Sequence, residues 1–514
     1  MRKVLKNIIM DNSIINLTKL KNKNKENLES SVILKEKINN REVNNRIKKE
    51  IQDDKNKTRN NPNLIRFKVI TFGCKTNQSE SDEIIRGLLS YGFKLVESDE
   101  KFDFIIINTC TVTSMADKKV RQFLRSIKQS NPDAKIIVTG CFVKFNDEFL
   151  KNEGIDNIFL NENKDEIVNF LKNKYINKIN NDFYNLKSKN LNENVKNQLN
   201  LIGKHTREFI KIQDGCEQGC SYCIIPYVRN KYKSEDPKKV IFDIEQSIKA
   251  GIEEIVLTGI HIGKYGVDFK ANDEIAIDNI KYSDLNLKLL IEIILKNTNI
   301  KRIRLSSIEI NEIDEDFLFL IKDNNRIAKH LHIPLQSASN KILKSMKRPY
   351  DKDTFYNKIS KIKEIIPDIT LTTDIIVGFP SEDEEDFKET LNAVKDINFS
   401  KVHVFKYSKR KFTLAAQMDF QVSEQIKNER SFKLRELASQ LRTNFISSNI
   451  GKILEVAIEN VNYSKGYLSG MSENYIKVYI PIENLKDNFN LKIGKIFKVK
   501  AVNFYLDGLL GNIS

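Results

Sequence analysis

The chain has no apolar run of about 18 residues or more, the length that a membrane-spanning helix needs. A membrane span is therefore not expected. The first residues also lack the compact apolar core of a secretory signal, and they carry too many acidic side chains for an ordinary transit peptide. These absences favour a cytoplasmic protein without a membrane partner.

Cysteine is scarce, with six residues among 514. Six cysteines could pair as three disulfides, but a chain of this length needs no disulfide staples and shows no export signal. A reducing compartment fits better. The six also fall into two groups of three, and one group is the compact C-x3-C-x2-C cluster of Cys216, Cys220 and Cys223.

The composition is that of a soluble protein of about two to four domains. The formal net charge is +16, and a basic surplus of this size favours an acidic partner, usually nucleic acid. About half of the surplus lies in residues 1–63, which hold 16 Lys/Arg and 8 Asp/Glu. This Asn- and Lys-rich segment predicts a disordered low-complexity tail. A basic arm that touches RNA and an organelle-targeting extension are the functional alternatives.

Strands alternate with helical segments in residues 64–175, which predicts a parallel α/β cluster-binding domain. The other three cysteines, Cys74, Cys110 and Cys141, each follow an apolar strand, at spacings of 36 and 31 residues. The C-terminal ends of parallel strands lie along one edge of the sheet. We therefore expect these distant cysteines to form one site. The predicted strands are Val69–Phe72, Phe104–Ile107 and Ile136–Thr139.

Two further domains are expected after a polar, Asn/Lys-rich linker at 176–206. Residues 207–442 contain six apolar strands separated by helical segments, which predicts a partial (β/α)6 barrel with its site at the C-terminal strand ends. The compact cysteine loop follows the first of these strands. Residues 443–514 predict a small β-barrel of a size used for binding oligonucleotides. The barrel strands are expected at Phe209–Ile212, Glu254–Leu257, Ile303–Leu305, His330–Ile333, Thr370–Ile376 and Val402–Phe405, and the later β segments at Ile453–Asn460, Tyr467–Met471, Tyr475–Ile480 and Ile496–Asn503.

The compact cysteine cluster predicts a cubane iron–sulfur centre with one iron free of protein ligands. Structural zinc is the main alternative, but zinc usually takes four ligands and no fourth cysteine lies nearby. His205 and His261 are too far along the chain for the common finger spacings. The four-cysteine ferredoxin pattern is not matched either. An open iron can chelate S-adenosylmethionine, whose chemistry the protein then orients and shields.

Several motifs together resemble the methylthiotransferase family of radical S-adenosylmethionine enzymes. The loop DGCEQGCSYCIIPYVR is similar to that family's radical-cluster loop, and TFGCKTNQSES, INTCTVT and VTGC are similar to its N-terminal cluster domain. LTGIHIGKYG, RIRLSSIE, HIPLQSASNKILKSMKRPY and TDIIVGFPSEDEEDF resemble successive barrel signatures. The last residues lie where the family carries a TRAM domain. Within the family, GCKTNQ and LTGIHIGKYG most resemble the branch that thiomethylates N6-threonylcarbamoyladenosine at position 37 of tRNA.

The resemblance implies two 4Fe–4S clusters and S-adenosylmethionine as cofactors. Cys216, Cys220 and Cys223 would hold the catalytic cluster that cleaves S-adenosylmethionine, and the three N-terminal cysteines would hold a second cluster that presents sulfur. One cofactor molecule would supply the methyl group, and another the radical that removes hydrogen from C2 of adenine. The tRNA anticodon stem-loop would be the substrate, and a flavodoxin or ferredoxin the electron donor.

Other residues are candidates for cofactor contacts, although each has a plainer structural explanation. Tyr222 could pack on the cofactor's adenine or simply fill the loop. The rest follow barrel strands, where turns need such residues anyway. They are Thr258 and Gly259 for the amino group, Gln336 and Ser337 for the carboxylate or ribose, and Gly378, Phe379 and Pro380 for an adenine-facing wall.

Four polar side chains and one histidine have open roles. Asn77 and Asn108 adjoin cluster cysteines and could donate hydrogen bonds to sulfide. Arg304 and Arg348 could meet tRNA phosphate or a cofactor carboxylate, although most arginines are solvated surface. His332 either lines the cavity or is a satisfied core histidine. The chain also has Phe412 where the family pattern has Gly.

Three alternatives to this function stay open. Sister branches of the family act on isopentenyl-adenosine in tRNA or on an aspartate of a ribosomal protein, and the N-terminal cysteine motifs argue against both. A non-catalytic iron–sulfur RNA-binding protein is the alternative from another class. The full set of barrel motifs argues against it, because such a protein needs no S-adenosylmethionine pocket.

Overall fold

The computed structural model describes residues 65–96, 100–155, 157–175, 207–270, 274–485 and 493–514. The predicted tail at 1–63 and the predicted linker at 176–206 lie outside these ranges. The described residues belong to one compact unit, Leu64–Ser514. None of the helices in these ranges is long and apolar enough to cross a membrane.

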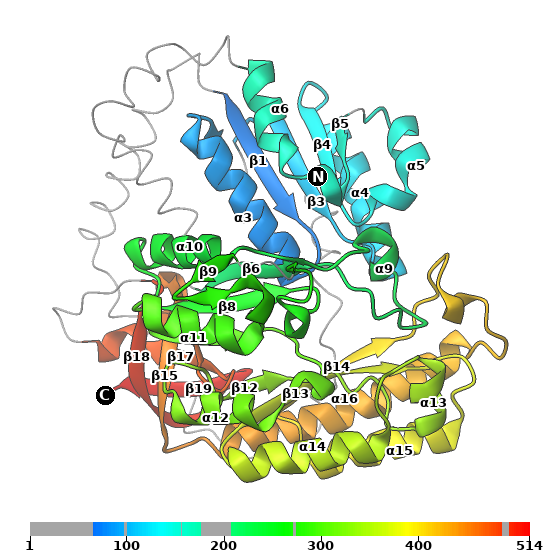
Figure 1. Ribbon diagram of the computed structural model, residues 1–514, viewed down its shortest axis with the longest axis vertical. Helices are drawn as coiled ribbons and strands as arrows, with labels where there is room; N and C mark the ends of the chain where they lie inside the picture. Colours follow the sequence, from blue (N-terminus) through cyan, green and yellow to red (C-terminus); the bar gives the residue numbers. More distant parts are fainter. Residues whose placement is uncertain (1–64, 97–99, 156, 176–206, 271–273, 486–492) are drawn as a thin grey trace, which may run out of the picture. The chain divides into compact units, whose positions relative to one another are not determined.

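A five-stranded parallel sheet with helices on both faces begins the unit (Figure 1). The strand order is β2-β1-β3-β4-β5, and every neighbouring pair is parallel. The three strands predicted here are present. The strands are β1 (Arg66–Thr71), β2 (Lys94–Leu95), β3 (Phe104–Thr109), β4 (Lys135–Gly140) and β5 (Asn157–Phe159). The helices are α3 (Lys75–Ser90), α4 (Ser114–Ser130), α5 (Asp147–Asn152) and α6 (Glu166–Tyr175).

The central strand β3 is buried on both faces, because its successive side chains enter opposite apolar layers. Ile106 packs with Phe67 and Leu88 on the side of α3 and α6. Ile105 and Ile107 pack on the side of α4 and α5. This double burial explains the unbroken apolar run in the sequence.

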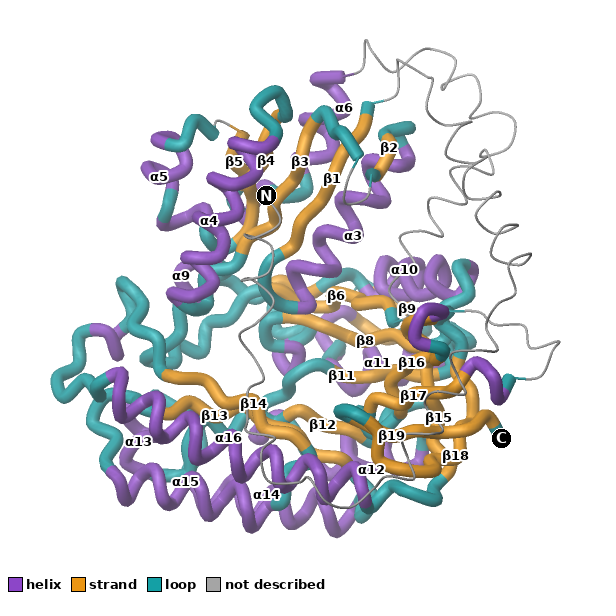
Figure 2. Tube along the Cα trace, turned by 180° about the vertical axis from the view of Figure 1, so that it is seen from behind, coloured by secondary structure: helices purple, strands orange, loops and turns teal. Residues whose placement is uncertain are grey.

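Six parallel strands in an arc form the partial barrel (Figure 2). Strands β6, β8 and β11 form one sheet and β12, β13 and β14 another, and isolated parallel bridges join the two between Ile303 and Ile327 and between Ser307 and His332. All six predicted strands are present. They are β6 (Glu208–Asp214), β8 (Glu254–Gly259), β11 (Arg302–Leu305), β12 (His330–His332), β13 (Thr370–Val377) and β14 (Lys401–Lys406). The smaller strands are β7 (Lys233–Ser234), β9 (Ile275–Ile277) and β10 (Ile280–Lys281).

Helices cover the outer face of this arc, and its inner face is polar. Leu257, Ile303 and Ile375 belong to the apolar core between strands and helices. Alternate positions on the same strands therefore face inward, among them Arg304 and Asp374. The helices are α9 (Ile225–Val228), α10 (Pro237–Lys249), α11 (Leu287–Asn297), α12 (Glu315–Asp323), α13 (Asn340–Ser345), α14 (Lys352–Ile365), α15 (Glu384–Ile397) and α16 (Glu424–Ser447).

A closed five-stranded barrel ends the chain, with strand order β15-β16-β17-β19-β18. Four of its strands match predicted segments, whereas β19 was not predicted from the sequence. The predicted boundary between 442 and 443 falls inside α16, whose Leu441 packs on the larger barrel and Ile446 on the smaller one. The other domain boundaries stay predictions. The strands are β15 (Ile453–Asn462), β16 (Tyr467–Ser472), β17 (Lys477–Pro481), β18 (Ile496–Tyr505) and β19 (Gly508–Ile513). The fold class predicted from the sequence is confirmed.

Candidate active site

Cys74, Cys110 and Cys141 come together at the C-terminal edge of the first sheet. Cys110 and Cys141 directly follow residues that pair across β3 and β4. The N–H of Cys141 donates to the carbonyl of Thr109 over 3.0 Å. A glycine precedes Cys74, and a Cβ atom on it would lie 2.7 Å from the Cβ of Cys110. The βα spacing of the sequence thus gathers three cysteines from three strand ends.

These thiols suit a soft metal centre. Burial above all, with the nearby Cys141 and Cys74, raises the pKa of the Cys110 thiol to about 12. Such a thiol keeps its proton at neutral pH unless a metal replaces it. Cys74 is exposed and stands at the N-cap of α3, where its side chain makes no capping hydrogen bond. Its thiol contacts Asn77 Oδ1 over 3.9 Å, which leaves the sulfur lone pairs available to a metal.

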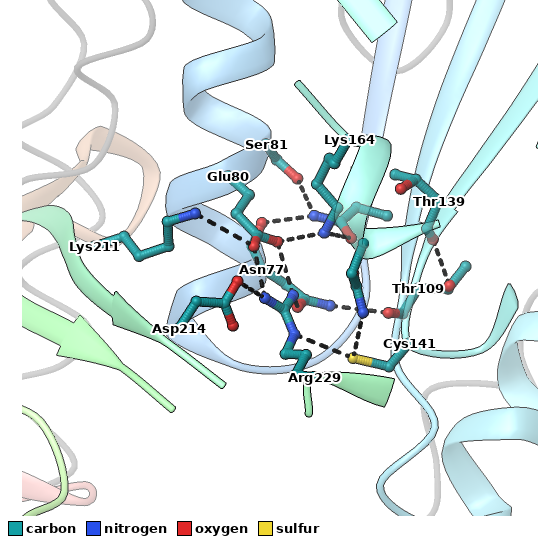
Figure 3. A network of polar contacts seen from close by, with 12 residues as sticks. Asn77, Glu80, Ser81, Thr109, Thr139, Cys141, Lys164, Lys211, Asp214 and Arg229 are labelled. Atoms are coloured by element: carbon teal, nitrogen blue, oxygen red, sulfur yellow. Dashed lines mark hydrogen bonds and ion pairs between the residues drawn. The ribbon is translucent and has the colours of Figure 1, made fainter. Parts of the chain in front are cut away.

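A buried arginine from the barrel reaches this edge (Figure 3). The Arg229 guanidinium donates to both carboxylate oxygens of Glu80, over 2.8 and 2.9 Å. It also donates to Asn77 Oδ1 over 3.1 Å and lies 3.5 Å from Cys141 Sγ. Asn161 Nδ2 approaches the same sulfur to 3.5 Å. Two donors from different elements thus converge on one cysteine.

Glu80 is the anionic centre of this network. Burial alone would raise the pKa of its carboxyl, but Lys164, Arg229 and Lys211 outweigh burial and hold the pKa well below its usual range. Lys164 and Arg229 contact the carboxylate directly, and Lys211 lies 3.7 Å away. Glu80 and Lys164 belong to the segment that contains the first sheet, whereas Arg229 and Lys211 belong to the partial barrel. The network therefore fixes one part against the other.

The compact cysteine loop leaves the barrel at the end of β6. Gly215 precedes it with φ +76°, and a Cβ atom there would lie 1.7 Å from the carbonyl oxygen of Lys231. Only glycine fits this turn. The N–H of Cys216 donates to the carbonyl of Arg229 over 3.0 Å, and that of Cys223 to the carbonyl of Cys220 over 3.0 Å. All three cysteines of the loop are partly exposed.

Two cations contact the sulfurs of this loop. Arg348 Nη1 donates to Cys220 Sγ over 3.3 Å. His261 Nδ1 lies 3.4 Å from Cys216 Sγ, and its Nε2 lies 2.7 Å from Glu312. Burial would lower the pKa of His261, but its contacts with Cys216 and Glu312 raise it to about 9. The sequence distance that set His261 aside was misleading, because the fold returns it to the cysteine loop.

Neither cysteine trio has the close spacing of a site for a single metal ion. Zinc–thiolate bonds of about 2.3 Å would bring three sulfurs within about 4 Å of one another. Within the described ranges, the one trio of possible ligands gathered within 4.8 Å is His332, Asp374 and His403. Neither cysteine trio is that tight. Soft thiolates held further apart fit a polynuclear iron–sulfur centre.

The predicted cofactor contacts meet different surroundings. Tyr222 packs against the buried Phe379 with ring centroids 6.5 Å apart, which supports loop filling. The Ser337 hydroxyl faces Thr390 at 3.4 Å. The N–H of Gly378 donates to a glutamate side chain over 2.8 Å. The N–H of Gly378 therefore already has a hydrogen-bond partner within its own turn. Phe379 is buried in an apolar cluster.

Of four other candidates, Gly259 and Gln336 are partly exposed, and Thr258 and Pro380 are buried. Thr258 is buried, while Gly259 is partly exposed at the end of β8. Gln336 has φ +64°, which is unusual for a residue with a side chain, and that side chain is partly exposed. Pro380 is buried beside the turn already described.

The remaining candidates, Arg304, Asn77, Asn108 and Phe412, have structural explanations. Arg304 is fully buried and pairs with a glutamate, so neither a phosphate contact nor a solvated surface describes it. Asn77 donates to the carbonyls of Phe72 and Thr109, and Asn108 donates to the carbonyl of Asn77, so both hold the strand ends together. Phe412 has φ +78°, the conformation that explains glycine in the family pattern.

His332 faces the inside of the barrel, where it lies 3.1 Å from Asp374 and is 14% exposed. The sequence pattern did not single out Arg229, Glu80 or Glu312. Each belongs to a contact between residues distant in the chain, and no local signal marks such a partner.

Comparisons with known proteins agree with this architecture. Residues 66–160 match the Uncharacterized protein family UPF0004, and residues 210–394 match the Radical SAM superfamily, so each matched range contains one cysteine trio. The threonylcarbamoyladenosine tRNA methylthiotransferase MtaB of Bacillus subtilis is 37% identical over 444 residues, which cover 84% of this chain and 92% of that protein. The chain belongs to the radical SAM methylthiotransferase family.

Other members of the family are also similar. MtaB of Aquifex aeolicus is 34% identical and is covered over 97% of its length, with 79% of this chain aligned. The tRNA-2-methylthio-N(6)-dimethylallyladenosine synthase of Thermodesulfovibrio yellowstonii is 33% identical, with 86% of this chain and 97% of that protein aligned. A radical SAM methylthiotransferase uses a 4Fe–4S cluster and S-adenosylmethionine, which the compact cysteine loop suits.

Proposed function

We propose that this protein transfers a methylthio group to C2 of N6-threonylcarbamoyladenosine at position 37 of tRNA. The observation that carries the proposal is the bond pattern of Arg229, which joins the two cysteine trios in one unit. The similarity to MtaB proteins over nearly their whole length supports the choice of substrate. A tRNA substrate also fits the net charge of +16 and a cytoplasmic location.

Two clusters would be held by the two trios. Cys216, Cys220 and Cys223 would ligate the catalytic 4Fe–4S cluster, and the three N-terminal cysteines would ligate a second one. Together with S-adenosylmethionine, bound clusters supply the radical, the methyl group and the sulfur. An electron donor such as a flavodoxin or ferredoxin would provide the reducing equivalent.

The chain's own residues would hold and tune these groups. Arg348 and His261 place positive charge against the thiolates of Cys220 and Cys216, and such contacts stabilise the more negative state of a cluster. Arg229 does the same for Cys141. The network around Glu80 fixes the distance between the two sites, as positioning of reactants requires.

The candidate residues for binding S-adenosylmethionine differ in their exposure and in the hydrogen-bond partners that they already have. A ligand would reach Gly259 and Gln336 most readily, because both residues are partly exposed. Thr258, Ser337 and Gly378 would contribute through the shape of their turns, and Tyr222 through packing of the cysteine loop. The C-terminal barrel would act as a TRAM-like RNA-binding module, and the target base would leave its stack to reach the site.

Mass spectrometry of tRNA nucleosides tests this proposal. Cells that lack the gene should lose 2-methylthio-N6-threonylcarbamoyladenosine and accumulate the unmodified threonylcarbamoyl nucleoside. An unchanged level of the methylthio nucleoside would refute the proposal. Loss of a methylthio isopentenyl nucleoside instead would indicate the second candidate, the activity for which a relative of 33% identity is named.

A further inference from the structure

Tyr475, between β16 and β17, projects into the larger barrel among several cations. It has φ +66°, and its ring stacks on His330 with centroids 4.7 Å apart and planes inclined by 20°. Arg304 lies 4.9 Å and Lys401 6.0 Å from the ring centroid. The ammonium of Lys75, from the first turn of α3, interacts with the side chain of Tyr475. Three parts of the chain thus meet inside the barrel.

Two arginines of this cluster, Arg304 and Arg207, are neutralised by carboxylates. Glu254 lies 3.0 Å from Arg304, and both side chains are fully buried. Arg207, whose guanidinium lies 5.7 Å from the Tyr475 ring centroid, pairs with Glu459 over 2.6 Å. Arg304 and Arg207 therefore offer no unpaired charge to a ligand.

The two lysines have no such partner. Within the described ranges, no carboxylate lies within 4 Å of the ammonium of Lys75 or Lys401, and both side chains are partly exposed. Burial, with the charge of Arg442, lowers the pKa of Lys401. An anion placed between the lysines would relieve this cost. Among the described residues, the inside of the barrel thus presents two ammonium groups without a carboxylate counter-ion.

Polar groups that can form hydrogen bonds lie beside the lysines. His332 and Asp374 are 3.1 Å apart, with exposed fractions of 14% and 27%, so solvent reaches them. The ligand atoms of these residues and of His403 lie within 4.8 Å of one another. A divalent cation would be opposed there by the charges of Lys401 and Lys75, which also act on His403. The site therefore suits an anionic, hydroxyl-bearing ligand better than a metal.

We propose that Lys75 and Lys401 bind the carboxylate of the threonylcarbamoyl group of the target base, while the His332–Asp374 pair faces its hydroxyl. The inference rests on the proposed function. Lys75 directly follows Cys74, the exposed ligand of the proposed sulfur-presenting cluster. A base whose C2 is near that cluster brings its N6 substituent into the same region. An apolar dimethylallyl group would leave both ammonium groups unpaired, which disfavours that substrate.

A pair of RNAs that differ in one charge tests the inference. Anticodon stem-loops would carry either the natural threonylcarbamoyl group or its carboxamide, which keeps the hydroxyl and removes the negative charge. The reconstituted holoenzyme should process the acid with a kcat/KM at least about tenfold above that of the amide. Dissociation constants for both RNAs, measured without reductant, should show the same preference.

Variants of the two lysines identify the partner of that charge. Lys75→Gln and Lys401→Gln should lower kcat/KM for the acid by about tenfold and leave the amide little changed. The matched control is Lys388→Gln on α15, whose side chain is 64% exposed, and it should stay within about twofold of wild type on both RNAs. Affinity for S-adenosylmethionine should not change in any variant.

Three outcomes would overturn the inference, each distinguishable from failure of the proposed function. Equal processing of acid and amide by the wild type would refute it and leave the function intact. Equal losses on both RNAs in the lysine variants would show a structural role only. Weakened S-adenosylmethionine binding with an unchanged acid-to-amide ratio would assign the lysines to the cofactor's carboxylate. If neither RNA is modified while an isopentenyl-adenosine stem-loop is, the proposed function itself fails.

Discussion

Arg229 Nε lies 3.5 Å from the sulfur of Cys141, although the two residues are 88 positions apart in the chain. The carbonyl of the same arginine accepts the N–H of Cys216, the first cysteine of the compact loop. One residue therefore contacts both cysteine trios, with its main chain at one and its side chain at the other. The relative position of the two sites depends on this residue and on its partner Glu80.

Replacement of Arg229 by glutamine should destabilise the protein by about 2 kcal/mol, because the buried Glu80 loses two hydrogen bonds from a cation and keeps Lys164 as its close partner. Urea unfolding measures the loss. The exposed Arg125→Gln, which removes a pair with Glu153, should cost less than about 1 kcal/mol. We also expect Arg229→Gln to keep forming 5′-deoxyadenosine while methylthiolation falls. Loss of both activities in equal measure would argue against a positioning role.

The two cysteine trios should bind iron independently. Anaerobic reconstitution of the wild type should give about eight irons per chain, and either triple Cys→Ala variant about four. The variant of Cys74, Cys110 and Cys141 should still cleave S-adenosylmethionine, whereas the variant of the compact loop should not. Four irons in the wild type, unchanged on loss of the N-terminal trio, would remove the second cluster from the account.

Much of this arrangement follows from local sequence signals. The apolar runs before Cys110 and Cys141 are buried parallel strands, and the length of one βα unit between them is enough to place the cysteines at one edge. By contrast, the start of α3 at Lys75 has no such local signal. Its first turns are polar because they face the cysteine site and the barrel, so hydrophobic periodicity could not detect them.

The contacts between distant segments could not be predicted in this way. Glu80 and Arg229 are 149 residues apart, and nothing in either local pattern indicates the other. His261 was set aside on sequence distance, yet the end of β8 brings it to Cys216. Tyr475 fell within a predicted strand but is the turn residue that enters the larger barrel. Tertiary packing decided each of these positions.

The stability contributed by His261 should depend on pH. Its pKa is raised to about 9 in the folded protein, so the stabilisation is complete below the ordinary pKa of about 6.5 and is lost as the pH rises through about 9. The wild type should therefore lose up to about 3 kcal/mol more than His261→Gln between these limits. Denaturation at a series of pH values checks this. Parallel curves for the two proteins would contradict the raised pKa.

A methyl group at Gly140 should displace the N-terminal trio. The residue has φ +101°, and a Cβ atom there would lie 2.3 Å from the carbonyl oxygen of Thr109. Gly140→Ala should cost about 1–3 kcal/mol and lower the iron of the second site only. Gly251→Ala, at φ +91° with open space around it, isolates the backbone strain from the clash. Equal effects of the two variants would mean that the close approach is unimportant.

In the proposed reaction, the two cysteine trios of one chain act on a single base of tRNA. Reaction of the reconstituted protein with S-adenosylmethionine, a reductant and a threonylcarbamoyl-bearing stem-loop, followed by mass spectrometry of the nucleosides, tests it most directly. We expect a 2-methylthio product that forms only when both trios are intact. Release of 5′-deoxyadenosine with no methylthio product, under conditions where both sites hold iron, would contradict it.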